Sequence, residues 1–230
     1  MTTAWLLALA GGVLIGLSAT LLLWLNGRVA GVSGILNGVL FPHSRDVAWR
    51  AAFLLGLIVA AGLYMMLVPG APQPRVDFPR AGLVVAGLLV GFGTRMGNGC
   101  TSGHGVCGIG LAMSGMTDPR RVLGFLDLFG DFDPTLMFVL GGAVATTMLL
   151  FRFVLRRGSP VLADTFHLSN LRHIDRRLLG GAAIFGIGWG IAGYCPGPAL
   201  AGLGAGSVEA LWFVPAMLAG LLLHRLVNRT

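Results

Sequence analysis

Residues 178–200 read LLGGAAIFGIGWGIAGYCPGPAL, and this stretch decides the fold. It is uncharged and apolar like a membrane helix, but glycine recurs through it, and Pro196 and Pro198 prevent a helix from continuing. Non-helical backbone at membrane depth is tolerated only where protein or a water-filled cavity surrounds it. The stretch therefore predicts a helix that breaks inside a membrane protein and places Cys195 at the break.

A second stretch has the same design. Residues 81–105 read AGLVVAGLLVGFGTRMGNGCTSGHG, so a glycine-rich apolar run again ends in a break that carries a cysteine, Cys100. The two cysteines are 95 positions apart. The same shift superimposes two pairs of glycines, Gly91 on Gly186 and Gly93 on Gly188. Paired, interrupted apolar segments in two halves of a chain indicate a transporter substrate site near the bilayer midplane. Glycines that only permit close helix packing are the alternative.

The composition is that of a membrane protein. The 230 residues are 55% hydrophobic and 11% charged, and the mean hydropathy is +0.82, values that exclude an ordinary soluble domain. Four to seven spanning or re-entrant segments are expected, because uncharged runs near the length of a membrane helix cover residues 4–25, 51–68, 135–151 and 178–208. The first run lacks a basic leader and a small-residue cleavage site, which favours a retained helix over a signal peptide.

All of the positive charge comes from arginine, and the net charge is +7. One interhelical segment holds six of these arginines, namely Arg152, Arg156, Arg157, Arg172, Arg176 and Arg177. The positive-inside rule places this segment in the cytoplasm. A nucleic-acid partner is not expected, because the segment has few aromatic residues.

The order of segments also repeats. Residues 28–31 match residues 121–124 in an Arg-Val-x-Gly pattern, and each is followed by an apolar run, a glycine-rich run and a cysteine break. We therefore expect one membrane domain over residues 1–230, built from internal repeats of about residues 1–110 and 111–230. The fold class expected is an all-α, pseudo-symmetric two-repeat bundle with re-entrant or broken helices that carry the cysteines. The middle of the chain is about two helices too short for complete repeats.

The surroundings of the first cysteine suit a small anion. Thr101, Ser102 and His104 supply side-chain donors, and the glycines around them let backbone approach a ligand closely. A helix N-terminus at this break would attract an anion and lower the pKa of the thiol. Cys195 is equivalent by the repeat, although a buried cysteine at a kink is its structural alternative.

Two further residues are secondary candidates. Cys107 completes a C-x3-H-x2-C set with Cys100 and His104, which resembles a copper or zinc site, but no fourth ligand is nearby and no metal is predicted. Arg95 is the only charge between residues 81 and 117. It either attracts an anion toward Cys100 or extends to the membrane interface.

At these residues the chain resembles the YeeE/YedE family of membrane proteins, which is implicated in uptake of thiosulfate and related sulfur compounds. The resemblance rests on two motifs, Asn98 to Gly105 and Gly193 to Ala199. It covers nearly the whole chain: residues 1 to about 110 are similar to the first of two short family subunits. The remainder is similar to the second, including Ser114-Gly115-Met116-Thr117-Asp118-Pro119 and Gly124-Phe125-Leu126-Asp127.

The resemblance implies a multi-pass bacterial inner-membrane permease that passes thiosulfate between thiols by hydrogen bonds, without covalent capture. A further cysteine near the start of some family members has no match between residues 11 and 34. The expected substrate-binding residues are Asn98, Gly99, Cys100, Thr101, Ser102, Gly103, His104, Cys195, Pro196 and Gly197, with Cys107 and Arg95 secondary.

The expected partners are a small sulfur-containing anion and the lipid bilayer, together with a homo-oligomer or a cytoplasmic sulfur-carrier protein. No cofactor and no enzymatic activity are expected. Two other functions remain open from the residues. One is a membrane thiol oxidoreductase in which Cys100 and Cys195 alternate between dithiol and disulfide. The other is a non-transporting subunit or sensor of a sulfur-uptake complex.

Overall fold

The computed structural model of the chain describes residues 2–28, 31–42, 47–69, 71, 74–97, 107–162, 165–166 and 175–228. These residues form helices and turns, with no strand among them, which confirms the all-α class. The helices are α1 (Thr2–Asn26), α2 (Val32–Leu40), α3 (Val47–Leu67), α4 (Arg80–Met96), α5 (Gly108–Met113), α6 (Pro119–Leu126), α7 (Thr135–Val154), α8 (Arg176–Ala192), α9 (Pro196–Gly204) and α10 (Val208–Val227).

Five segments of the described chain are long and apolar enough to cross a membrane, within the range of four to seven that the sequence predicts. They are α1, α3, α7, α10 and the α8–α9 segment. Large apolar side chains on their outer faces are exposed, such as Leu55, Met148 and Leu211. Such a surface suits lipid rather than water. The chain is therefore a multi-pass membrane protein.

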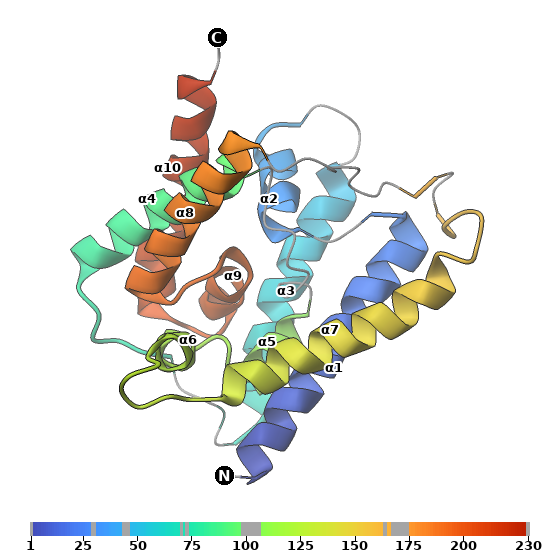
Figure 1. Cartoon of the computed structure of the whole chain (residues 1–230), viewed down its shortest axis with the longest axis horizontal. Helices are drawn as coiled ribbons and strands as arrows, with labels where there is room; N and C mark the ends of the chain where they lie inside the picture. The colour runs from blue at the N-terminus through green and yellow to red at the C-terminus, as the bar shows by residue number, and fades with distance from the viewer. Residues whose placement is uncertain are drawn as a thin grey trace.

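Apart from α3, which contacts the short helices α2, α5 and α9, the long helices pack in two groups. Figure 1 shows α1 and α7 side by side, and α4 grouped with α8 and α10. Glycines allow these close approaches: a Cβ atom at Gly12 would overlap the Val139 carbonyl oxygen of α7, and one at Gly91 would overlap the Met217 carbonyl oxygen of α10. Small residues at such contacts bring helix backbones together where burial from water supplies no driving force.

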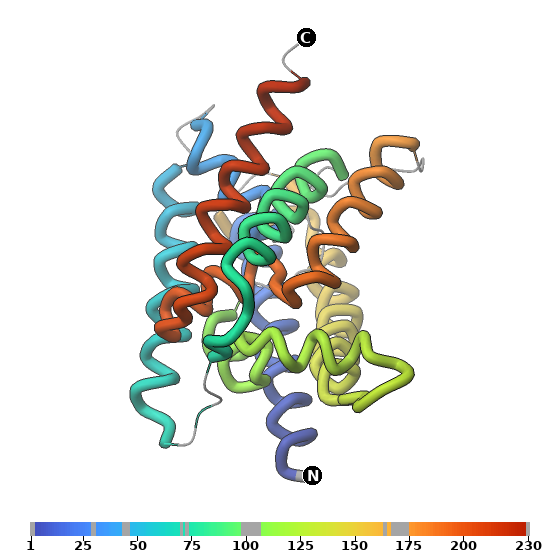
Figure 2. Tube along the Cα trace, turned by 90° about the vertical axis from the view of Figure 1, so that its left-hand side faces the viewer, coloured from blue at the N-terminus to red at the C-terminus, as the bar shows by residue number. Residues whose placement is uncertain are grey.

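The short helix α9 lies in the middle of the bundle in both views (Figures 1 and 2). Its nine residues, about 14 Å of helix, cannot cross a bilayer. Residues 196–202 are all buried, and α9 contacts α3, α10, α2 and α5. A short helix that is buried on every side belongs to the core, so the chain enters and leaves the interior around α9.

The junction between the two halves is short. One turn joins α5 to α6, and Asp118 caps α6 by accepting a hydrogen bond from the Arg120 N–H at 3.0 Å. Figure 2 shows α6 running across the direction of the long helices. An exposed turn over residues 127–132 then leads into α7. No spanning helix lies between α5 and α6, as the short spacing in the sequence predicts.

Candidate functional site

The break between α8 and α9 is built around Gly193. This residue has φ 74°, a left-handed conformation that favours glycine, and its N–H donates to the Trp189 carbonyl at 2.7 Å to end α8. A Cβ atom here would lie 2.6 Å from the Pro119 carbonyl oxygen. Both the backbone angle and the close approach of Pro119 therefore require glycine at this point.

Cys195 is the N-cap residue of α9 and is half-buried. Pro196 and Pro198 follow it in the first turn of the helix, where the absence of an N–H group costs nothing. The prolines thus begin a new helix as well as preventing α8 from continuing. Pro196 and Pro198 have no backbone N–H, and the Ala199 N–H already donates to the Cys195 carbonyl at 2.9 Å. Gly197 therefore supplies the backbone N–H that remains at this helix end. Cys195, Pro196 and Gly197, three consecutive residues of the predicted site, thus form the start of α9.

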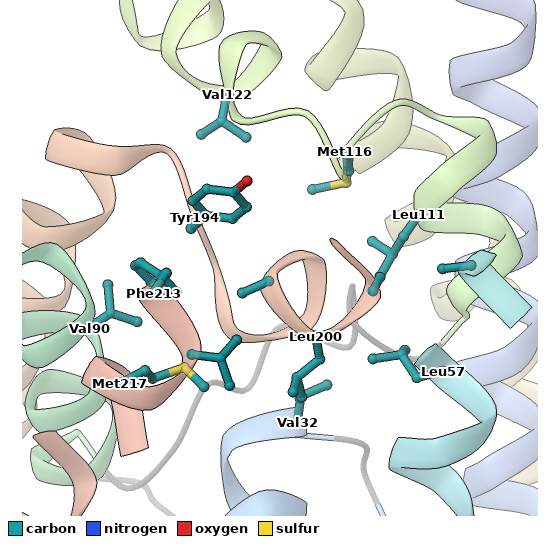
Figure 3. Close-up of a cluster of buried hydrophobic side chains, with 14 of the residues drawn as sticks. Val32, Leu57, Val90, Leu111, Met116, Val122, Tyr194, Leu200, Phe213 and Met217 are labelled. Atoms are coloured by element: carbon teal, nitrogen blue, oxygen red, sulfur yellow. The ribbon is translucent and has the colours of Figure 1, made fainter. Parts of the chain in front are cut away.

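Tyr194, the residue directly before this cysteine, is held in place by its side chain. Its side chain is fully buried, its hydroxyl lies 3.0 Å from that of Ser207, and its ring centroid lies 5.2 Å from that of Phe213. Figure 3 shows Tyr194 between Val122 and Phe213. The sequence motif includes Tyr194 but predicts no role for it. In the structure this residue joins the break to α6 and α10.

A buried ion pair lies beside the same break and was not predicted. Arg75 Nε donates to both carboxylate oxygens of Glu209 at 2.9 Å, and Arg75 Nη2 donates to the Ala192 carbonyl at 3.2 Å. Glu209 is the only glutamate of the chain and lies between apolar runs. That isolation is the signal that could have found it, because an ionisable residue within a membrane segment has a functional role by default.

The whole of the first cysteine motif, residues 98–105, lies outside the described residues. This applies to Asn98, Gly99, Cys100, Thr101, Ser102, Gly103 and His104. The segment begins where α4 ends, at Gly97, whose neighbours are residues of α8. The described chain resumes at Cys107, directly before α5. The equivalence of Cys100 with Cys195 thus remains a prediction from the sequence.

Cys107 has no equivalent in the sequence repeat, but the structure places it at the start of a short helix. It is the N-cap of α5, and its Sγ accepts a hydrogen bond from the Gly110 N–H at 3.3 Å. Cys195 is likewise the N-cap residue of a short helix, α9, but its side chain makes no capping hydrogen bond. Cys107 also lines an apolar cavity of about 320 Å³ with residues of α1 and α3, including Ser18 and Phe53.

Arg95 lies in the last turn of α4, and its side chain is exposed. A cation at this end of a helix is stabilised by the helix dipole. No cluster of three or more metal-ligating side chains occurs in the described part of the chain. The C-x3-H-x2-C set falls mainly outside that part, since both Cys100 and His104 do.

Comparison with known proteins adds a family and several relatives. A family model described as "Family of unknown function (DUF6691)" matches residues 100–230. A "Probable transporter" of Xylella fastidiosa (strain Temecula1 / ATCC 700964) is 47% identical over 125 residues, which are 54% of this chain and 84% of the relative. A protein of the same name from strain 9a5c is 48% identical over 124 residues, 53% of this chain and 85% of the relative.

A second "Probable transporter" of strain Temecula1 is 46% identical over 99 residues, which are 43% of this chain and 72% of that relative. Each relative is matched over most of its own length but over about half of this chain, so each is a shorter protein. No solved structure matches the chain.

Proposed function

The chain belongs to the DUF6691 family, and from that premise we propose that it is a membrane transporter that carries thiosulfate or a related sulfur-containing anion inward. Transport is supported by the relatives named as probable transporters and by the five helices that could cross a membrane. The sulfur cargo is supported by the thiol at the break and by the resemblance of the two cysteine motifs to the YeeE/YedE family.

The observation that carries this proposal is the position of Cys195. A partly exposed cysteine stands at the N-cap position of a helix that is itself buried in the middle of the bundle. Broken helices at such depth line a substrate path in many transporters. A thiol can donate a weak hydrogen bond to the terminal sulfur of thiosulfate, and no covalent bond needs to form.

In this proposal Cys100 and Cys195 are successive points on one path. Asn98, Thr101, Ser102 and His104 supply donors at the first point, where Gly99 and Gly103 permit close approach. Pro196 and Gly197 shape the second point. Cys107 and Arg95 are secondary contacts. A cytoplasmic position for this end of the molecule, in a bacterial inner membrane, is supported by the exposed side chains of Arg152, Arg156, Arg157, Arg176 and Arg177.

The two-repeat organisation belongs to the proposal as well. The order of a short helix, a long helix, a 17-residue helix and another short helix occurs as α2 to α5 and again as α6 to α9. We take residues 1–110 and 111–230 as repeats that join two short subunits, with α9 as a re-entrant segment. The shorter length of the relatives supports this.

Substitution of the two path cysteines tests the proposal. Cys100→Ala and Cys195→Ala are each expected to abolish growth on thiosulfate as sole sulfur source in an uptake-deficient host, at unchanged membrane expression. Cys107→Ser is the comparison variant: Cys107 is only a secondary contact and serine keeps an acceptor for the Gly110 N–H, so this variant is expected to grow. Full growth of both alanine variants would exclude a thiol-lined path.

Uptake by purified protein in liposomes tests the cargo. Labelled thiosulfate is expected to enter, and unlabelled thiosulfate is expected to compete better than sulfate, sulfite or selenite. Because the junction between the repeats is short, a second protomer or a sulfur-carrier protein is expected to complete the path. For the second protomer, light scattering of the purified protein is expected to show more than one copy of the chain per particle. A monomer that takes up thiosulfate alone would contradict the need for a partner.

A further inference from the structure

The Arg75–Glu209 pair is the most deeply buried charged contact in the described part of the chain. Arg75 is 6% exposed and Glu209 is 2% exposed. The carboxylate accepts both contacts from Arg75 Nε and a third hydrogen bond, at 3.0 Å, from the Phe78 N–H. The guanidinium also covers the Phe78 ring at 4.3 Å from its centroid. Both charges are therefore paired and further satisfied by hydrogen bonds.

These contacts join the ends of three helices. Glu209 lies in the first turn of α10, where the helix dipole stabilises a carboxylate. Phe78 directly precedes Pro79, the N-cap residue of α4. Arg75 donates to the carbonyl of Ala192, the last residue of α8. A carbonyl at this position has no N–H partner within its own helix. The pair thus ties the end of α8 to the starts of α4 and α10.

The end of α8 is also the start of the segment that carries the thiol. Ala192 is held by Arg75, Gly193 packs against Pro119, and Tyr194 contacts Ser207. Three successive residues before Cys195 are therefore each fixed by a different part of the chain. Of these, the contact with Arg75 is the one that depends on a buried charge.

Burial of a charge pair rarely increases stability over a well-packed apolar pair, whereas loss of one partner is strongly destabilising. The rigid, planar guanidinium group of an arginine, in contrast, holds a hydrogen-bond acceptor at a defined distance and angle. The geometry therefore fits a role in placing the Ala192 carbonyl better than a role in stability alone.

We infer that Arg75 and Glu209 are positioning residues that hold the α8–α9 break, and with it the thiol of Cys195, in the geometry that the path requires. Arg75 sets the Ala192 carbonyl, and Glu209 holds Arg75 in place. The inference rests on the proposed function for its effect on uptake, but the placement of the thiol can be measured without transport.

The rate of alkylation of each cysteine by N-ethylmaleimide, followed by peptide mass spectrometry on the full chain in liposomes, measures that placement. Glu209→Ala leaves Arg75 unpaired, so the break loosens and alkylation of Cys195 is expected to become at least about tenfold faster. Cys107 is the N-cap residue of α5 and lines a cavity with residues of α1 and α3, so its rate is the internal control. Thiosulfate uptake is expected to fall about 10- to 100-fold.

A double variant separates positioning from charge burial. Arg75→Met with Glu209→Leu removes both charges and keeps apolar volume, so folding and thermal stability are expected to recover. Alkylation of Cys195 is expected to stay fast and uptake to stay low, because the Ala192 carbonyl still lacks its donor. Wild-type alkylation and uptake in the double variant would overturn the inference. Absence of thiosulfate uptake by the wild-type protein would instead contradict the proposed function. The alkylation rates would then decide alone whether Arg75 and Glu209 position the thiol.

Discussion

The hydroxyl oxygen of Tyr194 lies 3.0 Å from that of Ser207, so the residue before Cys195 is joined to the residue that caps α10. Ser207 Oγ also accepts a hydrogen bond from the Ala210 N–H at 3.3 Å. One hydroxyl group therefore serves both the start of a long apolar helix and the break that carries the thiol. The contact therefore ties the break to the start of α10.

Tyr194→Phe tests that contact. The ring and its packing on Phe213 are kept, but the hydrogen bond to Ser207 is lost, so the free energy of unfolding is expected to fall by about 1 kcal/mol. Tyr64→Phe is the matched control, because Tyr64 is the only other tyrosine and has no side-chain hydrogen bond among the described residues. Unfolding in mixed micelles, followed by circular dichroism, measures both variants. An equal loss in the two would assign the effect to the change of residue type.

The break itself could be predicted from the sequence, because glycine and proline act on the backbone locally. Gly193 ends α8 and Pro196 begins α9 within the motif that the sequence marks. The all-helical class and the number of spanning segments follow equally from local composition. These features depend on a few neighbouring residues, and the structure agrees with them.

The contacts that hold the break could not be predicted in the same way. Arg75 and Glu209 are 134 residues apart, and no periodicity along one helix relates them. The position of Cys107 was missed for a different reason. Residue-by-residue alignment of the repeats pairs Cys100 with Cys195. By position relative to a helix, in contrast, Cys107 matches Cys195, because each is the N-cap residue of a short helix. More residues separate the end of α4 from the start of α5 than separate the end of α8 from the start of α9, so the two criteria select different cysteines.

Gly91→Ala and Gly186→Ala test how far the repeat extends to packing. The sequence repeat makes these glycines equivalent, but Gly91 lies against the Met217 carbonyl, whereas a Cβ at Gly186 meets no described atom within 4 Å. Gly91→Ala is therefore expected to lower the free energy of unfolding by about 1–3 kcal/mol through overpacking of α4 on α10. Gly186→Ala is expected to be neutral or slightly stabilising, because alanine favours the helix.

Unfolding in mixed micelles compares this pair of variants at the same temperature. Gly93→Ala and Gly188→Ala serve as further controls, since both glycines lie in the contact between α4 and α8. Both are expected to be destabilising. A large loss of unfolding free energy in Gly186→Ala would contradict the difference in packing between Gly91 and Gly186.

Substitutions at Cys107 test its role as a helix cap. Serine keeps an acceptor for the Gly110 N–H at the start of α5, and alanine does not. Cys107→Ser is therefore expected to be more stable than Cys107→Ala by about 0.5–1 kcal/mol. Thermal unfolding of the two variants in detergent measures this difference. Equal stability would mean that the contact with the Gly110 N–H contributes nothing.

Gly193→Ala tests the close approach of α6 to the break. An alanine here meets two costs: its φ of 74° is left-handed, and its Cβ would lie 2.6 Å from the Pro119 carbonyl oxygen. Gly206 is the matched control, because its φ is 76° but a Cβ there meets no described atom within 4 Å. Gly206→Ala is thus expected to cost only the backbone term, about 1–2 kcal/mol.

Gly193→Ala is expected to exceed that cost by a further 1–3 kcal/mol, roughly, because the Pro119 backbone must move. The same movement displaces the start of α9, so thiosulfate uptake at equal expression is expected to fall in Gly193→Ala and to persist in Gly206→Ala. Unfolding in mixed micelles and uptake in liposomes measure the two effects on the same preparations. Equal losses of stability in the two variants would show that the backbone angle alone requires glycine. The contact with Pro119 would then play no part in placing Cys195.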